Sequence, residues 1–129
     1  AAVRFDHDAY NRRAAARWAA RPVDDLVAAL RRERITAVFS MMPSLLLVDT
    51  VVHHQDIRRP LGLGTDFPPE ILTATLTALV TEGAFAADAR RVAGRRLVAT
   101  DVDWAHGDGG PELRAPAEEL IMTITGRSG

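Results

Sequence analysis

Residues 49–60, DTVVHHQDIRRP, are the stretch on which the interpretation of this sequence depends. They follow the apolar run LLLV at 45–48 and end at Pro60, the first of several Pro and Gly residues that favour a loop. We therefore expect one helix over residues 44–59. Its Leu and Val side chains spread around most of the circumference, which is typical of a helix that is buried on several sides.

Three polar residues of this helix share one face. Each residue advances about 100° around a helix, so Asp49, His53 and Asp56 fall within an arc of about 60°. Such a stripe is often simply solvated, but on a buried helix a carboxylate and an imidazole need a partner or a charge. One turn apart, they can present two ligands to a divalent metal. We predict Asp49 and His53 as metal ligands, with Asp56 and His54 orienting them, and no catalytic side chain.

Composition limits the classes of function. A chain of 129 residues is long enough for one domain with a core. A net charge of −1 and 5% aromatic residues argue against a nucleic-acid-binding surface. The absence of cysteine excludes disulfides, thiolate ligands and a catalytic thiol, so any zinc must bind His and carboxylates. Apolar windows too short for a membrane span, and no signal-peptide pattern, lead us to expect a cytoplasmic protein.

Four helices are expected in the first part of the chain. Periodicity and capping residues predict them over 6–20, over 22–38, over 44–59, and from Pro68 or Pro69 to about Ala87. In the first of these, Tyr10 and Trp18 are expected on a packed face and the arginines on a solvated one. Four helices are enough for an up-down bundle, whose core is a usual place for metal sites.

From about residue 90 the period of the pattern changes from 3.6 to 2. Residues 96–104 alternate, and the side that carries Val98, Thr100, Val102 and Trp104 is the more apolar, so we expect that side to be buried. The residues HGDGGP at 106–111 predict a turn, 111–115 a short returning strand, and 117–125 a last helix that Gly126 ends. The expected fold is α+β, mainly α, with a helical bundle at 1–90 and a small β-hairpin plus helix at 91–129.

Two separated segments resemble one known family. Residues 49–62 resemble the metal-binding helix of the mycothiol-dependent maleylpyruvate isomerase family, within the DinB-like superfamily, and residues 96–112 and 116–127 resemble its C-terminal segment. Residues 4–13 also resemble the start of this family, so the resemblance covers most of the chain. It implies a DinB-like bundle in which a divalent metal, usually zinc, is held by a histidine on an earlier helix and by a Glu-x-x-x-His pair on a later one.

The chain departs from this pattern in two ways. His53 matches the later histidine and Asp56 an acidic residue that follows it, but Asp49 stands where the family has Glu and is one methylene shorter. The histidine of the earlier helix has no counterpart here. We expect it before residue 1, in an N-terminal helix that this chain lacks, and the family's C-terminal segment normally continues beyond Arg127.

The resemblance implies thiol chemistry on a metal. Zinc or another divalent metal lowers the pKa of a bound thiol, and the thiolate of mycothiol would add to a small electrophile such as maleylpyruvate, as an isomerase or S-transferase. We expect the full-length parent to be an enzyme and this chain alone to be weak or inactive. The alternative is a non-catalytic or truncated scaffold that serves interaction or metal sequestration. The expected partners are the electrophile and a low-molecular-weight thiol, with no nucleic acid or membrane, in a monomer or homodimer.

Overall fold

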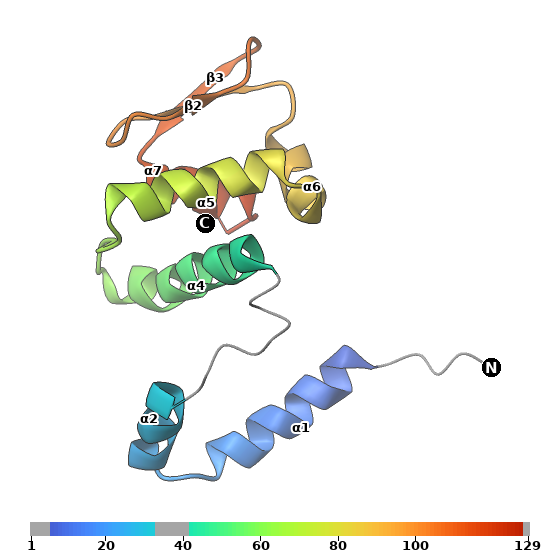
Figure 1. The fold of residues 1–129 in the computed structure, drawn as a ribbon, viewed down its shortest axis with the longest axis vertical. Coiled ribbons are helices and arrows are strands. Elements are labelled where there is room, and N and C mark those ends of the chain that lie inside the picture. Colours follow the sequence, from blue (N-terminus) through green and yellow to red (C-terminus); the bar gives the residue numbers. More distant parts are fainter. Residues whose placement is uncertain (1–5, 33–41, 128–129) are drawn as a thin grey trace, which may run out of the picture. The chain divides into compact units, whose positions relative to one another are not determined.

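The computed structural model describes residues 6–32 and 42–127 and is mainly helical with one small sheet (Figure 1). The chain divides into two compact units, Ala1–Thr36 and Ala37–Gly129. The boundary expected near residue 90 falls inside the second unit, because the last helix packs against a helix from the middle of the chain.

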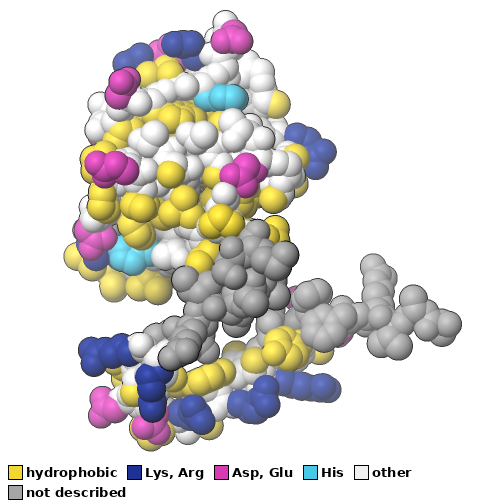
Figure 2. All heavy atoms as spheres, in the orientation of Figure 1, with side chains coloured by type: hydrophobic (Ala, Val, Ile, Leu, Met, Phe, Trp, Pro, Cys, Tyr) yellow, Lys and Arg dark blue, Asp and Glu magenta, His cyan; other side chains and the backbone are white. Residues whose placement is uncertain are grey.

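The first unit contains α1 (His7–Ala19) and α2 (Val23–Arg32). Asp6 caps α1 as expected, since its Oδ1 accepts a hydrogen bond of 2.9 Å from the backbone N–H of Ala9. Figure 2 shows arginine side chains standing along both helices. Trp18 is exposed rather than packed, and the Arg21 guanidinium lies 4.7 Å from its ring centroid. The end of the second expected helix, 33–38, lies outside the described residues.

The second unit is built on three longer helices, α4 (Pro43–Arg58), α5 (Pro69–Thr81) and α7 (Ala117–Ile124). Helix α5 packs against both α4 and α7. Shorter helical turns join them: η1 (Arg59–Leu61), η2 (Gly83–Phe85), α6 (Ala86–Ala89) and η3 (Arg90–Val92). The core lies between these helices and one face of the sheet, and its fully buried side chains include Val51, Leu76, Leu79, Leu120, Ile121 and Ile124.

Helix α5 ends earlier than the sequence pattern predicts. It stops at Thr81, where Glu82 takes an extended conformation (φ −95°, ψ 132°), and the helical axis turns by 76° before residues 83–92. The run AFAA at 84–87 favours helix, so the pattern continued the helix to Ala87, but the chain is extended at Glu82, and Gly83 has the low helix propensity of glycine. The break directs Phe85 into the core, where it is 5% exposed.

Proline and glycine set the ends of α7. Pro116 precedes its first turn, where Asp101 Oδ1 accepts a 2.7 Å hydrogen bond from the N–H of Ala117. Gly126 has φ +75°, which an L side chain rarely adopts. The N–H groups of Gly126 and Arg127 bond to the carbonyls of Thr123 and Met122 at 3.0 and 2.7 Å, the pattern of a Schellman motif.

The sheet differs from the expected hairpin. It contains β1 (Arg96–Ala99), β2 (Ala105–His106) and β3 (Glu112–Ala115) in the order β2-β1-β3. β2 is antiparallel to β1, whereas β3 is parallel to it, so β3 is not a returning hairpin strand. Gly110 permits this crossing, since a Cβ there would lie 1.9 Å from the carbonyl oxygen of Gly94.

The buried side of β1 is also opposite to the expected one. Leu97 and Ala99 are 1% and 7% exposed, while Val98 is only half-buried. The strand expected over 96–104 ends at Ala99, because the chain bends at 100–103, and a four-residue strand has two positions on each side. Trp104 reaches the core from beyond the bend, where its Nε1–H donates a 3.0 Å hydrogen bond to Thr77.

No helix in the described part of the chain is by itself long and apolar enough to cross a membrane. The bent pair 69–81 and 83–92 reaches that length and apolarity only when its two parts are taken together.

Candidate metal centre on helix α4

Helix α4 presents two different faces. Val48, Val51, Val52 and Gln55 are buried against the core, and Pro43 at its first turn fixes where the helix begins. The predicted polar stripe lies on the other side, with the side chains of Asp49 and His53 56% and 59% exposed. Within the second unit the helix is therefore buried on one side, and its polar stripe faces outward.

The three stripe residues contact one another through the two nitrogens of His53. Nδ1 forms a 3.2 Å hydrogen bond with Asp56 Oδ2, and Nε2 lies 3.2 Å from Asp49 Oδ1. An ionised carboxylate only accepts hydrogen bonds, so the Asp56 contact is a hydrogen bond in the tautomer of His53 that carries its proton on Nδ1. The Nε2 lone pair is then left on the side of Asp49, as a metal ligand requires.

The spacing of Asp49 and His53 suits a shared metal ion. In a tetrahedral zinc site with bonds of about 2.0–2.1 Å, two ligand atoms are separated by about 3.3 Å. The observed separation of Oδ1 and Nε2 is 3.2 Å. The shorter Asp side chain therefore reaches a ligand position beside His53 without any movement of the helix.

Asp56 has a second partner that the sequence did not predict. Arg127 Nε lies 3.1 Å from both carboxylate oxygens of Asp56, although the two residues are 71 positions apart. Arg127 directly follows Gly126, whose left-handed conformation turns the chain at the end of α7. The sequence shows a Gly-Arg pair directly after the last helix, but it does not show which residue the arginine contacts, because that depends on how α7 packs.

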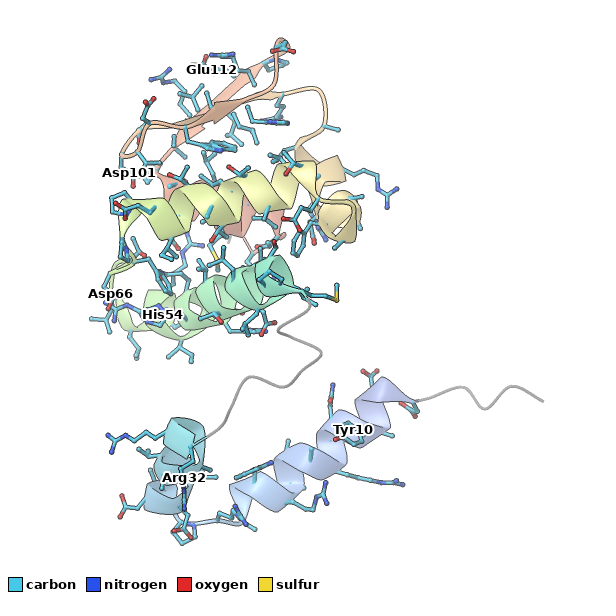
Figure 3. The ribbon with its side chains drawn as sticks, in the orientation of Figure 1. Tyr10, Arg32, His54, Asp66, Asp101 and Glu112 are labelled. Atoms are coloured by element: carbon cyan, nitrogen blue, oxygen red, sulfur yellow. The ribbon has the colours of Figure 1, made fainter. Side chains whose placement is uncertain are left out.

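His54 takes a different environment from the one expected. Its ring is half-buried and packs edge-on against Phe67, with the centroids 4.7 Å apart. Its Nε2 lies 3.7 Å from Asp66 Oδ1, and Figure 3 shows the two labelled side chains beside each other at one end of α4. The contacts of His54 are thus with the segment between α4 and α5 rather than with Asp49 or Asp56.

A shallow pocket adjoins the candidate centre. It has a volume of about 390 Å³, and its lining residues are Gln55, Asp56, Arg59, Pro60, Met122 and Arg127. Arg59 is paired with Glu118 and Glu119, and Arg127 with Asp56. Both cations in the wall are therefore neutralised, which argues against a site for an anionic ligand.

Glu118, beside this pocket, has a perturbed carboxyl group. Burial raises the pKa of Glu118, the Arg59 guanidinium lowers it, and the charges of Glu119 and Asp101 raise it further. Its Oε1 is 3.2 Å from Arg59 Nε, yet this buried oxygen has no hydrogen-bond partner within the described residues. The charge attraction between Arg59 and Glu118 is thus present without a well-aligned hydrogen bond, and burial has the larger effect on the pKa of Glu118.

The described residues supply two metal ligands and not a complete site. Residues 6–32 and 42–127 contain no group of three or more His, Asp or Glu side chains that could hold a metal ion. Asp49 and Asp56 do not converge on one point, because they contact opposite nitrogens of His53. Zinc usually takes three or four protein ligands, so Asp49 and His53 fit part of a site.

Comparisons of the chain with protein-family models, with curated proteins and with solved structures each give no match. The resemblance of residues 49–62 and 96–127 to the mycothiol-dependent isomerases therefore stays an expectation from sequence. Function has to be inferred from the geometry of the site.

Proposed function

We propose that α4 carries two ligands of a divalent-metal site, Asp49 and His53, in a protein of the mycothiol-dependent, DinB-like isomerase type. The observation that carries this proposal is the arrangement around His53. One nitrogen is hydrogen-bonded to a carboxylate that fixes the ring, and the other faces a second carboxylate at the separation of two metal ligands.

The contact between Asp49 and His53 favours a bound cation. With the proton on Nδ1, the Nε2 lone pair faces a carboxylate oxygen, and two acceptors at 3.2 Å repel each other. A proton or a metal ion between them removes that repulsion. Zinc accepts both nitrogen and oxygen ligands, and the Asp56 hydrogen bond makes the imidazole a stronger ligand.

The chemistry that follows is addition of a small thiol to a small electrophile. A bound zinc ion lowers the pKa of a coordinated thiol, so that thiolate is present near neutral pH. The sequence has no cysteine, so the thiol comes from a small molecule, for which the sequence resemblance names mycothiol. In this chain Asp49 and His53 would hold the metal, and Asp56 would accept the hydrogen bond from Nδ1–H of His53.

One observation favours a second function, that of a non-catalytic scaffold that sequesters metal or binds a partner. The two ligands are more than half exposed, and the described residues add no third ligand. An ion held by two protein ligands and several waters exchanges easily, which suits sequestration better than catalysis.

Calorimetric titration with zinc tests the proposal. We expect binding heat for the whole chain, and a large loss of it for His53→Ala and for Asp49→Ala. His106→Ala is the matched control, because His106 is also an exposed histidine but stacks on Trp104, with ring centroids 6.2 Å apart. Equal heats for the whole chain and His53→Ala would remove His53 from the site.

A second measurement separates the enzyme from the scaffold. The zinc-loaded chain is mixed with a small thiol and a conjugated electrophile, and the loss of electrophile absorbance is followed. Zinc binding with acceleration that depends on His53 supports the enzyme. Zinc binding without acceleration supports sequestration.

A further inference from the structure

We propose that Arg127 is a positioning residue for the metal ligand His53 and acts through Asp56. This inference rests on the proposed metal-binding function of His53. The chain of contacts begins at the end of α7 and ends on the exposed face of α4. It joins Arg127 to Asp56, Asp56 to Nδ1 of His53, and Nε2 of His53 to Asp49.

The first contact fixes the Asp56 carboxylate. Arg127 Nε is 3.1 Å from each of its two oxygens, so rotation of the carboxylate about its terminal bond would weaken one of these contacts. In that orientation Oδ2 lies 3.2 Å from His53 Nδ1. The guanidinium therefore selects the carboxylate position from which Asp56 can hold the imidazole.

The backbone of Arg127 is itself held in place. Its N–H bonds to the Met122 carbonyl in the Schellman motif, and its carbonyl accepts a 3.4 Å hydrogen bond from Arg59 at the end of α4. Its Nη1 also donates to the carbonyl of Thr125 at 3.2 Å. The two backbone bonds fix where the side chain of Arg127 starts, and the Nη1 bond holds its guanidinium.

The Arg127–Asp56 pair is too weak to add much to the free energy of unfolding, but it is strong enough to orient the Asp56 carboxylate. The side chains are 37% and 35% exposed, and ion pairs at such positions contribute little to the free energy of unfolding. Without Arg127, the Asp56 carboxylate can turn into solvent, and the imidazole can rotate and exchange its two nitrogens. We expect a loss of Arg127 to change the state of His53 far more than the stability of the fold.

The experiment compares Arg127→Gln with Arg114→Gln as a matched control. Arg114 is also an exposed arginine in one ion pair, with Glu112 Oε1 at 2.9 Å, but Glu112 contacts no histidine among the described residues. The nitrogen-15 shifts of the His53 ring are recorded without metal, and zinc affinity is then measured. We expect Arg127→Gln alone to move the ring shifts toward a mixture of tautomers and to weaken zinc binding a few-fold, because Arg127 acts through an exposed ion pair and lies one contact further from His53 than Asp56 does.

A double-mutant cycle with Asp56→Asn tests whether Arg127 acts through Asp56. We expect Arg127→Gln to weaken zinc binding in the natural background and to have no further effect in the Asp56→Asn background. Arg127→Lys should recover part of the zinc affinity, because a lysine restores the positive charge but not the contact of Nε with both oxygens of Asp56.

Three results would overturn the inference. The first is zinc binding by Arg127→Gln that equals that of Arg114→Gln. The second is an equal loss of affinity on adding Arg127→Gln in both backgrounds. The third is an unchanged His53 ring spectrum in Arg127→Gln. If Arg127→Gln lowers stability, the ring spectrum of Asp56→Asn is measured instead, and an unchanged spectrum in that variant also overturns the inference. Absence of zinc binding by the natural chain would refute the proposed function, while the metal-free spectra still test the contact chain.

Discussion

Asp101 caps a helix that begins 16 positions later, and its removal should destabilise the second unit by about 2 kcal/mol. In Asp101→Ala the N–H of Ala117, a fully buried residue, loses its 2.7 Å hydrogen bond. An unsatisfied buried donor costs about 1–3 kcal/mol, and the loss of a carboxylate at a helix N-terminus adds about 0.3–1 kcal/mol. Part of this is offset: burial raises the pKa of Glu118 and Asp101 raises it further, so Glu118 ionises more easily in the variant.

Urea unfolding followed by circular dichroism measures the effect. A loss of about 2 kcal/mol corresponds to a Tm lower by roughly 10 °C for a unit of this size. Asp101→Asn, which keeps an acceptor but not the charge, should lose about half as much. Asp103 is exposed in the same bend and has no side-chain hydrogen bond or ion pair within residues 6–32 and 42–127, so Asp103→Ala should stay within about 0.5 kcal/mol. Equal destabilisation by Asp101→Ala and Asp103→Ala would refute the capping role.

Two further predictions concern helix α7, at Glu118 in its first turn and at Gly126 after its last turn. Because the pKa of Glu118 is raised in the fold, chiefly by burial, its contribution to stability is present at acid pH and is lost as pH rises through the folded pKa. Glu118→Gln should therefore have a higher urea midpoint than the natural chain at pH 7 and lose that advantage below about pH 4, near the unfolded pKa; a constant offset from pH 4 to 8 would contradict this. Gly126→Ala should cost about 1–2 kcal/mol, because alanine resists the left-handed conformation and its Cβ would lie 2.9 Å from Arg91 Nε. It should also weaken zinc binding by displacing Arg127, whereas Gly109→Ala, with nothing within 4 Å of its Cβ, should do neither.

Helix starts were the part of this fold best predicted from sequence. Pro69 opens α5 and Pro116 immediately precedes α7, and both helices begin within a residue or two of their expected positions. Helix α4 begins at Pro43, one residue before the expected start at residue 44. Proline is informative here because it suits the first turn and cannot continue a preceding helix. The end of α5 was wrong, since a single Gly83 had to be weighed against a run of alanines that favours helix.

The sheet could not be predicted from local pattern. Periodicity indicates that a segment is extended, but it does not say which strand is its neighbour or in which direction. The parallel pairing of β1 with β3 depends on a crossover through β2 and on the close approach of Gly110 to Gly94. The buried side of β1 was wrong because the pattern was read across the bend at residues 100–103 as one strand.

The candidate site was predictable where it is local and not where it is distant. Helical spacing alone brought Asp49, His53 and Asp56 together, because residues three and four apart are neighbours on any helix. Arg127 reaches Asp56 only after α7 has packed against α5 and α5 against α4. His54 was placed by adjacency to His53, but neighbours in sequence point about 100° apart on a helix, and His54 meets Asp66 and Phe67 instead.

Energies of two different sizes hold His53 in position. Turning α4 by one residue would bring Val51, which is fully buried, toward solvent, and fully burying one valine is worth about 1.5–3 kcal/mol. Core packing therefore fixes the direction in which His53 leaves the helix. The remaining choice is between the staggered rotamers of the His53 side chain. An exposed ion pair of up to about 1 kcal/mol is enough to shift the balance between them. The weak Arg127–Asp56 contact can therefore orient His53 although it adds little to the stability of the fold.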